Sequence, residues 1–390
     1  MTDVAIIGVG QTRFGMFPER TLKNLFQEAS RNALDDIDFG LDPKDVDEAF
    51  VGSLSTGGAQ LGNFAPLMME AAGMVGTGAR HVENACASSG FAMRDAVAAI
   101  ASGRAKIAVA AGIEKMSDLP RERNRLWLGI SGDVEWERLA GTNFAGIYAM
   151  MARRHMHDFG TTKEQITRVA VKNRRNALSN PKAQFRAALT LEQGMAAPSL
   201  ASPLTFADAC GITDGASMVI LCRADLAKSF TKQPILVAGT GAGSDYVAIH
   251  DRPSITMLRG ATDAAKEAYA MAGITPEDID FAEVHDCFAI AELLAYEDLG
   301  FCERGSSGLY IESGATEREG KRPVNNSGGL IAKGHPIGAT GTGQIYEVAN
   351  QLRGRIDEKE RQLEGIQYGL THNVGGSGAA VAVHVLKVVE

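Results

Sequence analysis

Cys86 stands where a reactive thiol is commonly built. It follows a short pattern typical of a buried strand and precedes a predicted helix, for which Ser88 and Ser89 are candidate N-caps. A helix N-terminus favours thiolate over thiol, so we expect the pKa of Cys86 to lie below the free value of about 8.5. A thiolate in an open turn is a nucleophile. The alternative for any single cysteine is a buried and inert thiol. We interpret Cys210, Cys222 and Cys302 in this way.

A base for this nucleophile is available near the end of the chain. The glycine-rich run from Asn326 to Gly341 holds His335 between Gly334 and Pro336. Repeated glycine indicates that the backbone approaches a bound ligand closely. We therefore expect His335 to accept the proton of the cysteine.

Two further polar clusters could complete a site. The strand pattern at Glu283 ends in His285, Asp286 and Cys287, and strand ends are where α/β enzymes place their chemistry. The segment His372–Gly378 is predicted to be a glycine turn, whose backbone N–H groups could stabilise an oxyanion.

The elements that must position these residues occur twice along the chain. Buried-strand patterns end in glycine at Val4–Gly10 and again at Ile235–Gly241. Helical patterns follow them at Leu22–Leu34 and Ala261–Ala272, with closely similar offsets. The spacing predicts a duplicated strand–helix–strand unit.

Strands alternate with helices in both halves, which predicts a mainly parallel sheet covered on both faces in each. We expect an α/β protein whose N-terminal half comprises residues 1–117 and 201–232, and whose C-terminal half comprises residues 233–390. Between them, residues 118–200 have few strand patterns and are predicted to form an inserted loop domain.

Residues 151–190 carry a local excess of positive charge. The basic residues of this segment are Arg153, Arg154, Lys163, Arg168, Lys172, Arg174, Arg175, Lys182 and Arg186, against the acidic Asp158 and Glu164. One interpretation is a solvated face on an amphipathic helix at Gln165–Leu178. The other is a surface that recruits anions such as phosphates. Both remain open.

Composition excludes several classes of protein. The 390 residues are 45% hydrophobic and 22% charged, which excludes disorder and coiled coil. The net charge of −8 is unfavourable for nucleic-acid binding. Five cysteines without a CxxC spacing argue against a disulfide framework or a structural metal site. Since no apolar run is long enough for a signal peptide or a membrane span, we predict a cytoplasmic protein without membrane partners.

Together these motifs identify a family resemblance that covers the whole chain. The Cys86 turn, Glu114–Ser117, Asp214–Ala216 and the run Asn326–Gly341 occur in the order found in thiolases. Most thiolases carry Asn-Glu-Ala-Phe near the third cluster and a second catalytic cysteine in the last glycine loop. Here these positions hold His285–Phe288 and Asn373. That departure is typical of the sterol-carrier-protein-type and archaeal-type branch, in which the acid/base cysteine lies at the position of Cys287.

The resemblance implies five layers (α/β/α/β/α) built from two thiolase halves, with a loop domain covering the coenzyme A (CoA) site. It also implies roles. His335 deprotonates Cys86, which attacks an acyl-CoA to form an acyl-enzyme, and Cys287 exchanges a proton at the α-carbon of a second acyl-CoA. The N–H groups of Cys86 and Gly375 hold one oxyanion, and His335 and His285 hold the thioester oxygen that becomes enolate.

On this basis we expect an acyltransferase that uses CoA thioesters as substrates, without a bound cofactor or metal, and that joins two acetyl-CoA molecules. A degradative thiolase that cleaves longer, branched or aromatic 3-oxoacyl-CoA remains the alternative. The CoA phosphates are expected near the basic segment 151–190. By resemblance, the partners are further copies in a homodimer or homotetramer, and a small zinc-ribbon/OB-fold protein that binds acyl-CoA.

Three rival functions compete with this interpretation. A dinucleotide site at Gly8-Val9-Gly10 fails because Arg13 occupies the third glycine position. A catalytically silent, thiolase-like scaffold subunit is opposed by the presence of all four reactive residues, although Asn373 keeps it open. A condensing enzyme that hydrolyses or decarboxylates its intermediate is disfavoured by the position of Cys287.

Overall fold

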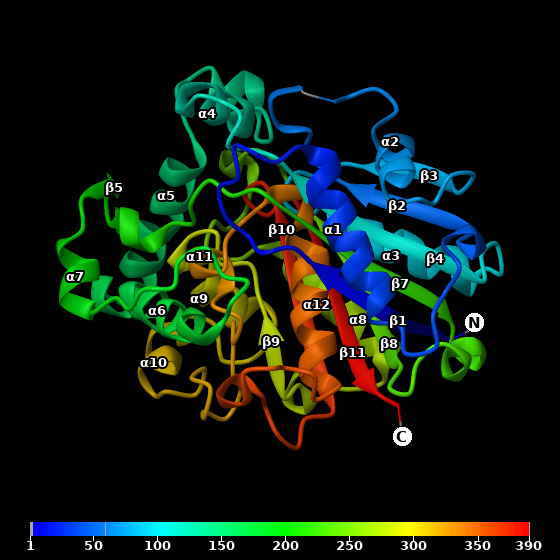
Figure 1. The fold of residues 1–390 in the computed structure, drawn as a ribbon. Coiled ribbons are helices and arrows are strands. Elements are labelled where there is room, and N and C mark those ends of the chain that lie inside the picture. Colours follow the sequence, from blue (N-terminus) through cyan, green and yellow to red (C-terminus); the bar gives the residue numbers. More distant parts are fainter. Residues whose placement is uncertain (1–2, 59, 390) are drawn as a thin grey trace.

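The computed structural model describes residues 3–58 and 60–389, and its centre is one mixed sheet (Figure 1). In this described part, nine strands follow the order β3-β2-β4-β7-β1-β8-β11-β10-β9. Their bounds are β1 Val4–Gln11, β2 Glu48–Gly52, β3 Gly78–Val82, β4 Ile107–Glu114, β7 Gly215–Arg223, β8 Ile235–Ser244, β9 Phe281–Glu283, β10 Tyr368–Gly375 and β11 Ala380–Val388. A separate hairpin is formed by β5 Ser199–Ala201 and β6 Leu204–Thr205.

The helices form where the sequence supplies an apolar face, and some of them also begin after a capping side chain. They are α1 Leu22–Asp35, α2 Phe64–Ala71, α3 Ser88–Ala101, α4 Arg121–Gly129, α5 Phe144–Phe159, α6 Lys163–Asn176, α7 Leu191–Ala196, α8 Arg259–Ala272, α9 Ala289–Asp298, α10 Ser307–Glu312, α11 Gly329–Ala332 and α12 Thr340–Leu352. For example, α1 begins after Thr21, whose hydroxyl accepts from the Asn24 N–H while the Asn24 side chain accepts from the Thr21 N–H. Over the described residues, no helix combines the length and apolarity needed to cross a bilayer.

The two halves meet at β1 and β8, where Ala5 pairs with Leu236 and Ile6 with Ile235. Outward from this junction the pairing pattern is mirrored, so the predicted duplication is visible in the topology. The helices α3 and α12 pack on each other and on strands of both halves. Because α1 and α2 cover the outer face of the first half and α8 and α9 that of the second, the body has the expected five α/β/α/β/α layers.

Residues of β1 alternate between two cores. Ile6 packs in the central core with α3 and α12, whereas Ala5 and Ile7 pack in the outer core with α1 and α2. Successive side chains of a strand point to opposite faces, so a strand covered on both faces must be apolar throughout. This is why β1 is a continuous apolar run in the sequence.

The prediction of a mainly parallel sheet is wrong. In the described sheet, β2 pairs in parallel with β3 and β4, and β9 with β10, whereas the other five pairings are antiparallel. The physical reason is a missed strand. Of the segment His372–Gly378, in which we predicted a glycine turn, only Gly376–Gly378 form the turn. Its first four residues belong to β10, which joins β11 directly through this short hairpin without a crossover helix.

The segment predicted as an insertion, residues 118–200, is largely helical and lies at the left of Figure 1 as α4–α7. Its apolar stripe is confirmed, since Ile166, Val169, Ala170 and Ala177 are fully buried. The residue boundaries proposed for the domains stay predictions.

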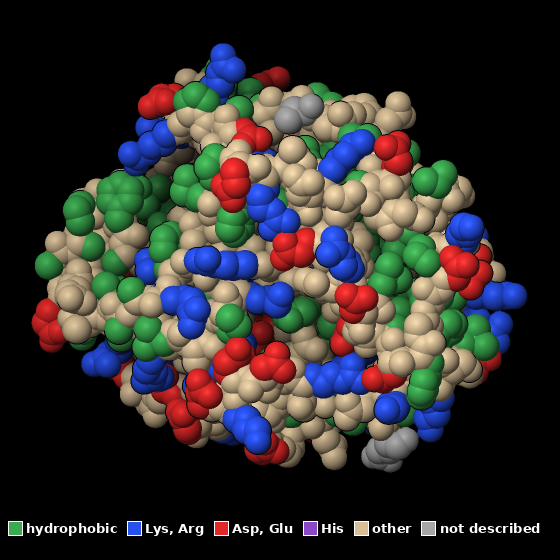
Figure 2. All heavy atoms as spheres, viewed as in Figure 1, with side chains coloured by type: hydrophobic (Ala, Val, Ile, Leu, Met, Phe, Trp, Pro, Cys, Tyr) green, Lys and Arg blue, Asp and Glu red, His purple; other side chains and the backbone are tan. Residues whose placement is uncertain are grey.

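The positive charge of residues 151–190 is largely paired with acidic side chains. Within the described chain, five of its basic residues form ion pairs with acids: Arg154–Asp158, Lys163–Asp208, Arg168–Glu312, Lys172–Glu292 and Arg175–Glu317. Four of these acids lie outside the segment, so these ion pairs hold residues 151–190 against the rest of the protein. Figure 2 accordingly shows basic and acidic side chains interspersed over the face in view.

Candidate active site

Three side chains from distant parts of the chain meet in one place. The Sγ atom of Cys86 and one ring nitrogen each of His285 and His335 all lie within 4.8 Å of one another. The two imidazole rings meet edge to face, with their centroids 5.0 Å apart. These residues lie in the turn before α3, in the segment after β9 and in the loop between α11 and α12. The spacing would also suit a cation, and the sequence-based expectation of no metal stays a prediction.

The turn that carries Cys86 is held by Ser88, although not in the way we predicted. The Ser88 hydroxyl donates to the Ala85 carbonyl at 2.6 Å and accepts from the Asn84 N–H at 3.0 Å. In the described chain α3 begins at Ser88, after an N-cap, Ala87, that makes no side-chain capping bond. The predicted caps are therefore wrong. The φ of Ala85 is +50°, an uncommon backbone conformation for a residue with a Cβ, and it aims the next residue into the site.

The prediction of a lowered pKa for Cys86 is wrong. Burial, the largest cause, raises the pKa of this thiol to about 12, and the nearby carboxylates Glu114 and Glu83 act in the same direction. The N–H groups of Gly376 and of Cys86 itself act in the opposite direction but are weaker. Desolvation of a charge outweighs the partial charges of a helix N-terminus. The resting nucleophile is therefore a neutral thiol.

His335 is also neutral at rest, because burial lowers its pKa to about 3. Its tautomer follows from its neighbours. The Thr340 hydroxyl donates to the Pro336 carbonyl at 3.0 Å, so at 2.6 Å it must accept from Nδ1–H of His335. This leaves a lone pair on Nε2, which suits a general base. The backbone N–H of His335 donates to Thr213 Oγ1 at 3.0 Å and fixes the loop.

Asn373 sets the opposite tautomer in His285. Its Oδ1 accepts from the Gly90 N–H at 3.2 Å, which orients the amide, and its Nδ2 donates to the Cys86 carbonyl at 2.9 Å. The same Nδ2 lies 3.4 Å from Nδ1 of His285. The proton of His285 therefore sits on Nε2, which is buried and without a hydrogen-bond partner among the described residues. Burial and the neighbouring His335 hold the pKa of His285 well below 6.5, so this group is a neutral N–H donor.

Cys287 is buried beside the same centre, 6% exposed. Burial raises its pKa well above the ordinary value, and the nearby thiols of Cys210 and Cys86 add to this effect. Cys210, which we interpreted as a buried and inert thiol, donates its N–H to the Cys287 carbonyl at 3.0 Å. Its own pKa is also raised by burial.

Tyr148 is a site residue that the sequence analysis missed. This side chain of α5 is 1% exposed, its hydroxyl donates to the Gly376 carbonyl at 3.2 Å, and the neighbouring Cys287 raises the pKa of the tyrosine. No motif marks it, because it lies in the segment that we treated only as a cover. Thr340 was likewise missed, although it lies within the glycine-rich run.

Acidic residues after β9 hold the loop that carries His335. Glu283 accepts from the N–H and the hydroxyl of Ser327, and Asp286 accepts from the N–H groups of Leu330 and Ile331. The strand end with His285 and Cys287 is thereby tied to α11, directly before the base.

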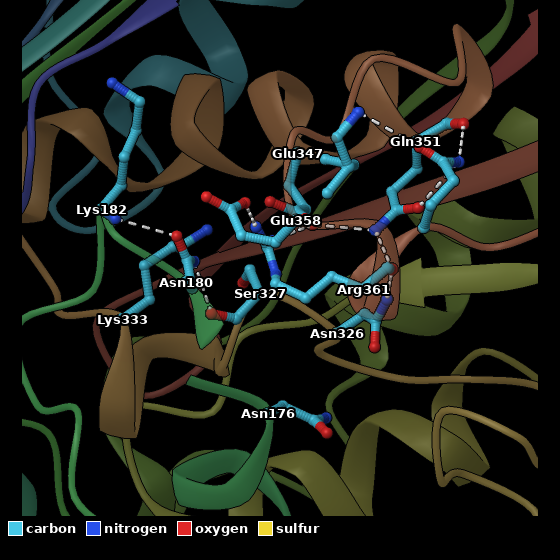
Figure 3. A network of polar contacts seen from close by, with 12 residues as sticks. Asn176, Asn180, Lys182, Asn326, Ser327, Lys333, Glu347, Gln351, Glu358 and Arg361 are labelled. Carbon is cyan, nitrogen blue, oxygen red and sulfur yellow. Dashed lines mark hydrogen bonds and ion pairs between the residues drawn. The ribbon is translucent and has the colours of Figure 1, made fainter. Parts of the chain in front are cut away.

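Figure 3 shows the polar network that backs this loop. Asn180 donates to the Ser327 carbonyl at 2.7 Å, and Asn326 donates to the Arg361 carbonyl at 2.8 Å. Arg361 in turn pairs with Glu347 at 2.6 Å. Because these partners are buried, the loop is held rigidly.

Gly375, predicted to supply an oxyanion-hole N–H, ends β10 close to the nucleophile turn. A Cβ placed on it would lie 2.3 Å from the Asn84 carbonyl, so the backbones approach closely and only glycine fits. The N–H that contacts the Cys86 sulfur belongs to the next residue, Gly376. The oxyanion role of Gly375 stays a prediction.

An open groove of about 620 Å³ lies along α5. Its lining residues are Gly146, Ala149, Met150, Arg153, Arg154, His157, Ala201, Ser202 and Ile255. The volume is in the range of sites for small ligands. Its walls are apolar and its basic side chains belong to the segment 151–190.

Comparison with known protein families accounts for both halves of the chain. Residues 4–225 match "Thiolase, N-terminal domain" and residues 241–388 match "Thiolase C-terminal domain-like". The chain belongs to the thiolase family. The resemblance drawn from the sequence motifs is thereby confirmed.

Relatives of this thiolase agree with that assignment. It is 45% identical to an acetyl-CoA acetyltransferase of Methanothermobacter thermautotrophicus over 99% of this chain and 100% of the relative. It is 36% identical to the benzoylsuccinyl-CoA thiolase subunit BbsB of Thauera aromatica, over 96% and 94%. Human sterol carrier protein 2 is 32% identical over 97% of this chain and 71% of its own length. This thiolase is accordingly an acyltransferase of the predicted branch.

Solved structures support the fold of this thiolase. An Ltp2-ChsH2(DUF35) aldolase matches with a TM-score of 0.85 and 26% identity, over 99% of this chain and 98% of the other. Human mitochondrial 3-ketoacyl-CoA thiolase matches with a TM-score of 0.77 and 20% identity, over 100% and 99%. The thiolase-like fold predicted from the sequence is confirmed.

Proposed function

We propose that this thiolase condenses two acetyl-CoA molecules to acetoacetyl-CoA and free CoA through an acetyl-enzyme on Cys86. The observation that carries the proposal is the meeting of Cys86, His335 and His285 within 4.8 Å, beside the buried thiol of Cys287. The choice of the acetyl group is supported by the acetyl-CoA acetyltransferase that is 45% identical over its full length. CoA thioesters are the substrates, and no bound cofactor is invoked.

The first half-reaction acetylates Cys86. The Cys86 thiol and the His335 imidazole are both neutral at rest. Nε2 of His335 therefore takes the thiol proton as the sulfur attacks the thioester carbon. The N–H groups of Cys86 and Gly375 stabilise the tetrahedral oxyanion. As the bond to CoA breaks, Cys287 protonates the leaving CoA sulfur. The products are acetyl-Cys86, free CoA, a protonated His335 and a Cys287 thiolate.

The second half-reaction forms the carbon–carbon bond. The Cys287 thiolate removes an α-proton from the second acetyl-CoA, and the enolate oxygen accepts from Nε2–H of His285 and of the protonated His335. His335 can donate there only in its protonated form, because Thr340 already accepts from Nδ1–H. The enolate carbon attacks the acetyl carbon, the bond to Cys86 breaks, and the Cys86 sulfur recovers its proton from His335.

The groove along α5 is our candidate for the CoA moiety. Arg153 and Arg154 lie on it, in the basic segment from which we expected phosphate contacts. Arg153 donates to the Ser202 hydroxyl at 2.9 Å and pairs with no acidic side chain of the described residues, so its charge remains available to an anion. The apolar wall suits the pantetheine arm.

The partners belong to the proposal as well. The solved structure of an Ltp2-ChsH2(DUF35) aldolase contains a DUF35 component, which supports the expected small acyl-CoA-binding protein as a partner of this chain. We further propose a homodimer or homotetramer, and a cytoplasmic location in keeping with five free cysteines.

A degradative thiolase acting on a larger 3-oxoacyl-CoA is the second candidate. It is favoured by one observation, the 36% identity to a benzoylsuccinyl-CoA thiolase subunit. Against it, the stacked rings of Tyr148 and Phe288, 4.8 Å between centroids, occupy space next to Cys287. A bulky acyl group would have to displace them.

The experiment is to incubate the protein with acetyl-CoA and weigh it intact, then to assay thiolysis of a panel of 3-oxoacyl-CoA esters with free CoA. We expect one acetyl adduct, absent from Cys86→Ser, and the highest kcat/KM for acetoacetyl-CoA. If no acyl-CoA ester forms an adduct, the result favours the silent scaffold. A preference for aromatic or branched esters would favour the second candidate.

A further inference from the structure

Tyr148 connects the two thiols of the site through contacts of its own. Its hydroxyl donates to the Gly376 carbonyl, and Gly376 is the residue whose N–H contacts the Cys86 sulfur. Its ring stacks on Phe288, the residue after Cys287, at an interplanar angle of 28°. Two anchors that do not involve Cys287 thus fix the tyrosine beside that thiol.

The surroundings of Cys287 make an anion there costly. Cys210, Cys86 and Asp286 all disfavour its charged form, as does burial. Asp286 is itself held by Asn173 and by backbone N–H groups, and Arg252 lowers the pKa of Tyr148. A hydrogen bond donated by the Tyr148 hydroxyl acts in the opposite direction, because it lowers the pKa of Cys287. The reaction nevertheless needs a Cys287 thiolate between its two halves.

We propose that Tyr148 is a positioning residue that turns its hydroxyl from the Gly376 carbonyl to the Cys287 sulfur whenever that sulfur is a thiolate. The proton stays on the tyrosine oxygen, and only its acceptor changes. The inference rests on the proposed function and deepens it, because it makes the α5 segment a part of the acid/base half of the site rather than a cover. A charge-assisted hydrogen bond of this kind is stronger than one between neutral groups.

The test is Tyr148→Phe, which keeps the ring stack and removes the hydroxyl. The readout is exchange of the α-hydrogens of acetyl-CoA with D2O, followed by mass spectrometry as a function of pH. We expect exchange to fall about 10- to 100-fold near neutral pH and the apparent pKa of the exchange step to rise by about one unit, while acetylation of Cys86 persists.

Tyr269→Phe is the matched control, because Tyr269 is also buried and also donates to one backbone carbonyl, that of Leu299, at 2.9 Å. It should leave the exchange profile unchanged. If Tyr148→Phe shows the wild-type pH profile, or lowers acetylation and exchange in parallel without a shift, the hydroxyl is merely structural and the proposal is overturned. Failure of the proposed function is distinguishable, because the wild type itself would then form no acetyl adduct.

Discussion

The hydroxyl oxygen of Thr340 lies 2.6 Å from Nδ1 of His335, five residues earlier in the chain. Because this hydroxyl donates its own proton to the Pro336 carbonyl, it can only accept a hydrogen bond from the imidazole. The contact therefore decides which ring nitrogen keeps a lone pair for Cys86. The first residue of α12 thus sets the chemistry of a loop residue.

Thr340→Val is predicted to slow acetylation of Cys86 by about 10- to 100-fold, because the isosteric side chain removes the acceptor for a buried N–H. Rapid-quench mass spectrometry of the acetyl-enzyme measures this rate. Thr340→Ser keeps the hydroxyl and should retain most of it. Equal rates in both variants would show that the tautomer is set by something else.

Cys287→Ala is predicted to leave the acetyl adduct on Cys86 but to abolish α-hydrogen exchange and acetoacetyl-CoA formation, because the base for the second half-reaction is gone. Intact mass and product assays on one sample check both. Cys302→Ala, which removes a partly buried thiol from the segment after α9, serves as the control. Sustained turnover in Cys287→Ala would show that Cys287 is not the base of the second half-reaction.

Asn373→Asp is predicted to impair carbon–carbon bond formation by about 10- to 100-fold. A carboxylate can only accept, so Nδ1 of His285 would carry the proton and Nε2 would lose its N–H toward the enolate. His285→Ala should match this loss, and the double variant should be no worse than either single one. Additive losses in a kcat comparison would contradict the coupling.

Arg153→Gln is predicted to raise KM for CoA about 3- to 10-fold with little change in kcat, if its charge meets a CoA phosphate, since it contributes to binding and not to the reaction. Steady-state thiolysis measures both constants. Arg259→Gln, an exposed residue of α8 paired with Asp263, is the control. An unchanged KM would show that the CoA phosphates do not bind at Arg153.

The buried histidines are predicted to destabilise the protein as the pH drops from about 6.5 to 4. Burial lowers the pKa of His335 and His372 to about 3 and that of His384 to about 4, so in this window the unfolded chain binds protons that the folded chain does not. Burial raises the pKa values of Asp286 and Asp298 to about 7, so these acids stabilise the folded protein as the pH falls. Their effect is the same in the wild type and in a histidine variant, and it cancels when the two are compared. Urea unfolding of wild type and His384→Gln between pH 4 and 7 isolates the histidine: the variant should lose less stability toward pH 4, and parallel curves would contradict the prediction.

Local patterns in the chain were sufficient to predict the elements and the reactive residue types. Apolar runs, helical periodicity and glycine bursts arise from local hydrogen bonding and burial, and so β1, β8, α1 and α8 lie where their patterns predicted. The order of motifs was enough to identify the family. It was not enough to find β10, because its glycine, histidine and asparagine resemble a turn until a neighbouring strand pairs with them.

Charge states and side-chain partners, in contrast, exist only in the folded molecule. The thiol of Cys86 is neutral because the surrounding fold desolvates it, and desolvation is a sum over residues distant in the chain. The tautomers of His335 and His285 depend on single acceptors and donors, Thr340 and Asn373, whose side chains reach the imidazoles only after folding. Tyr148 reaches Cys287 from a segment 139 residues away, and no local pattern records a contact of that range.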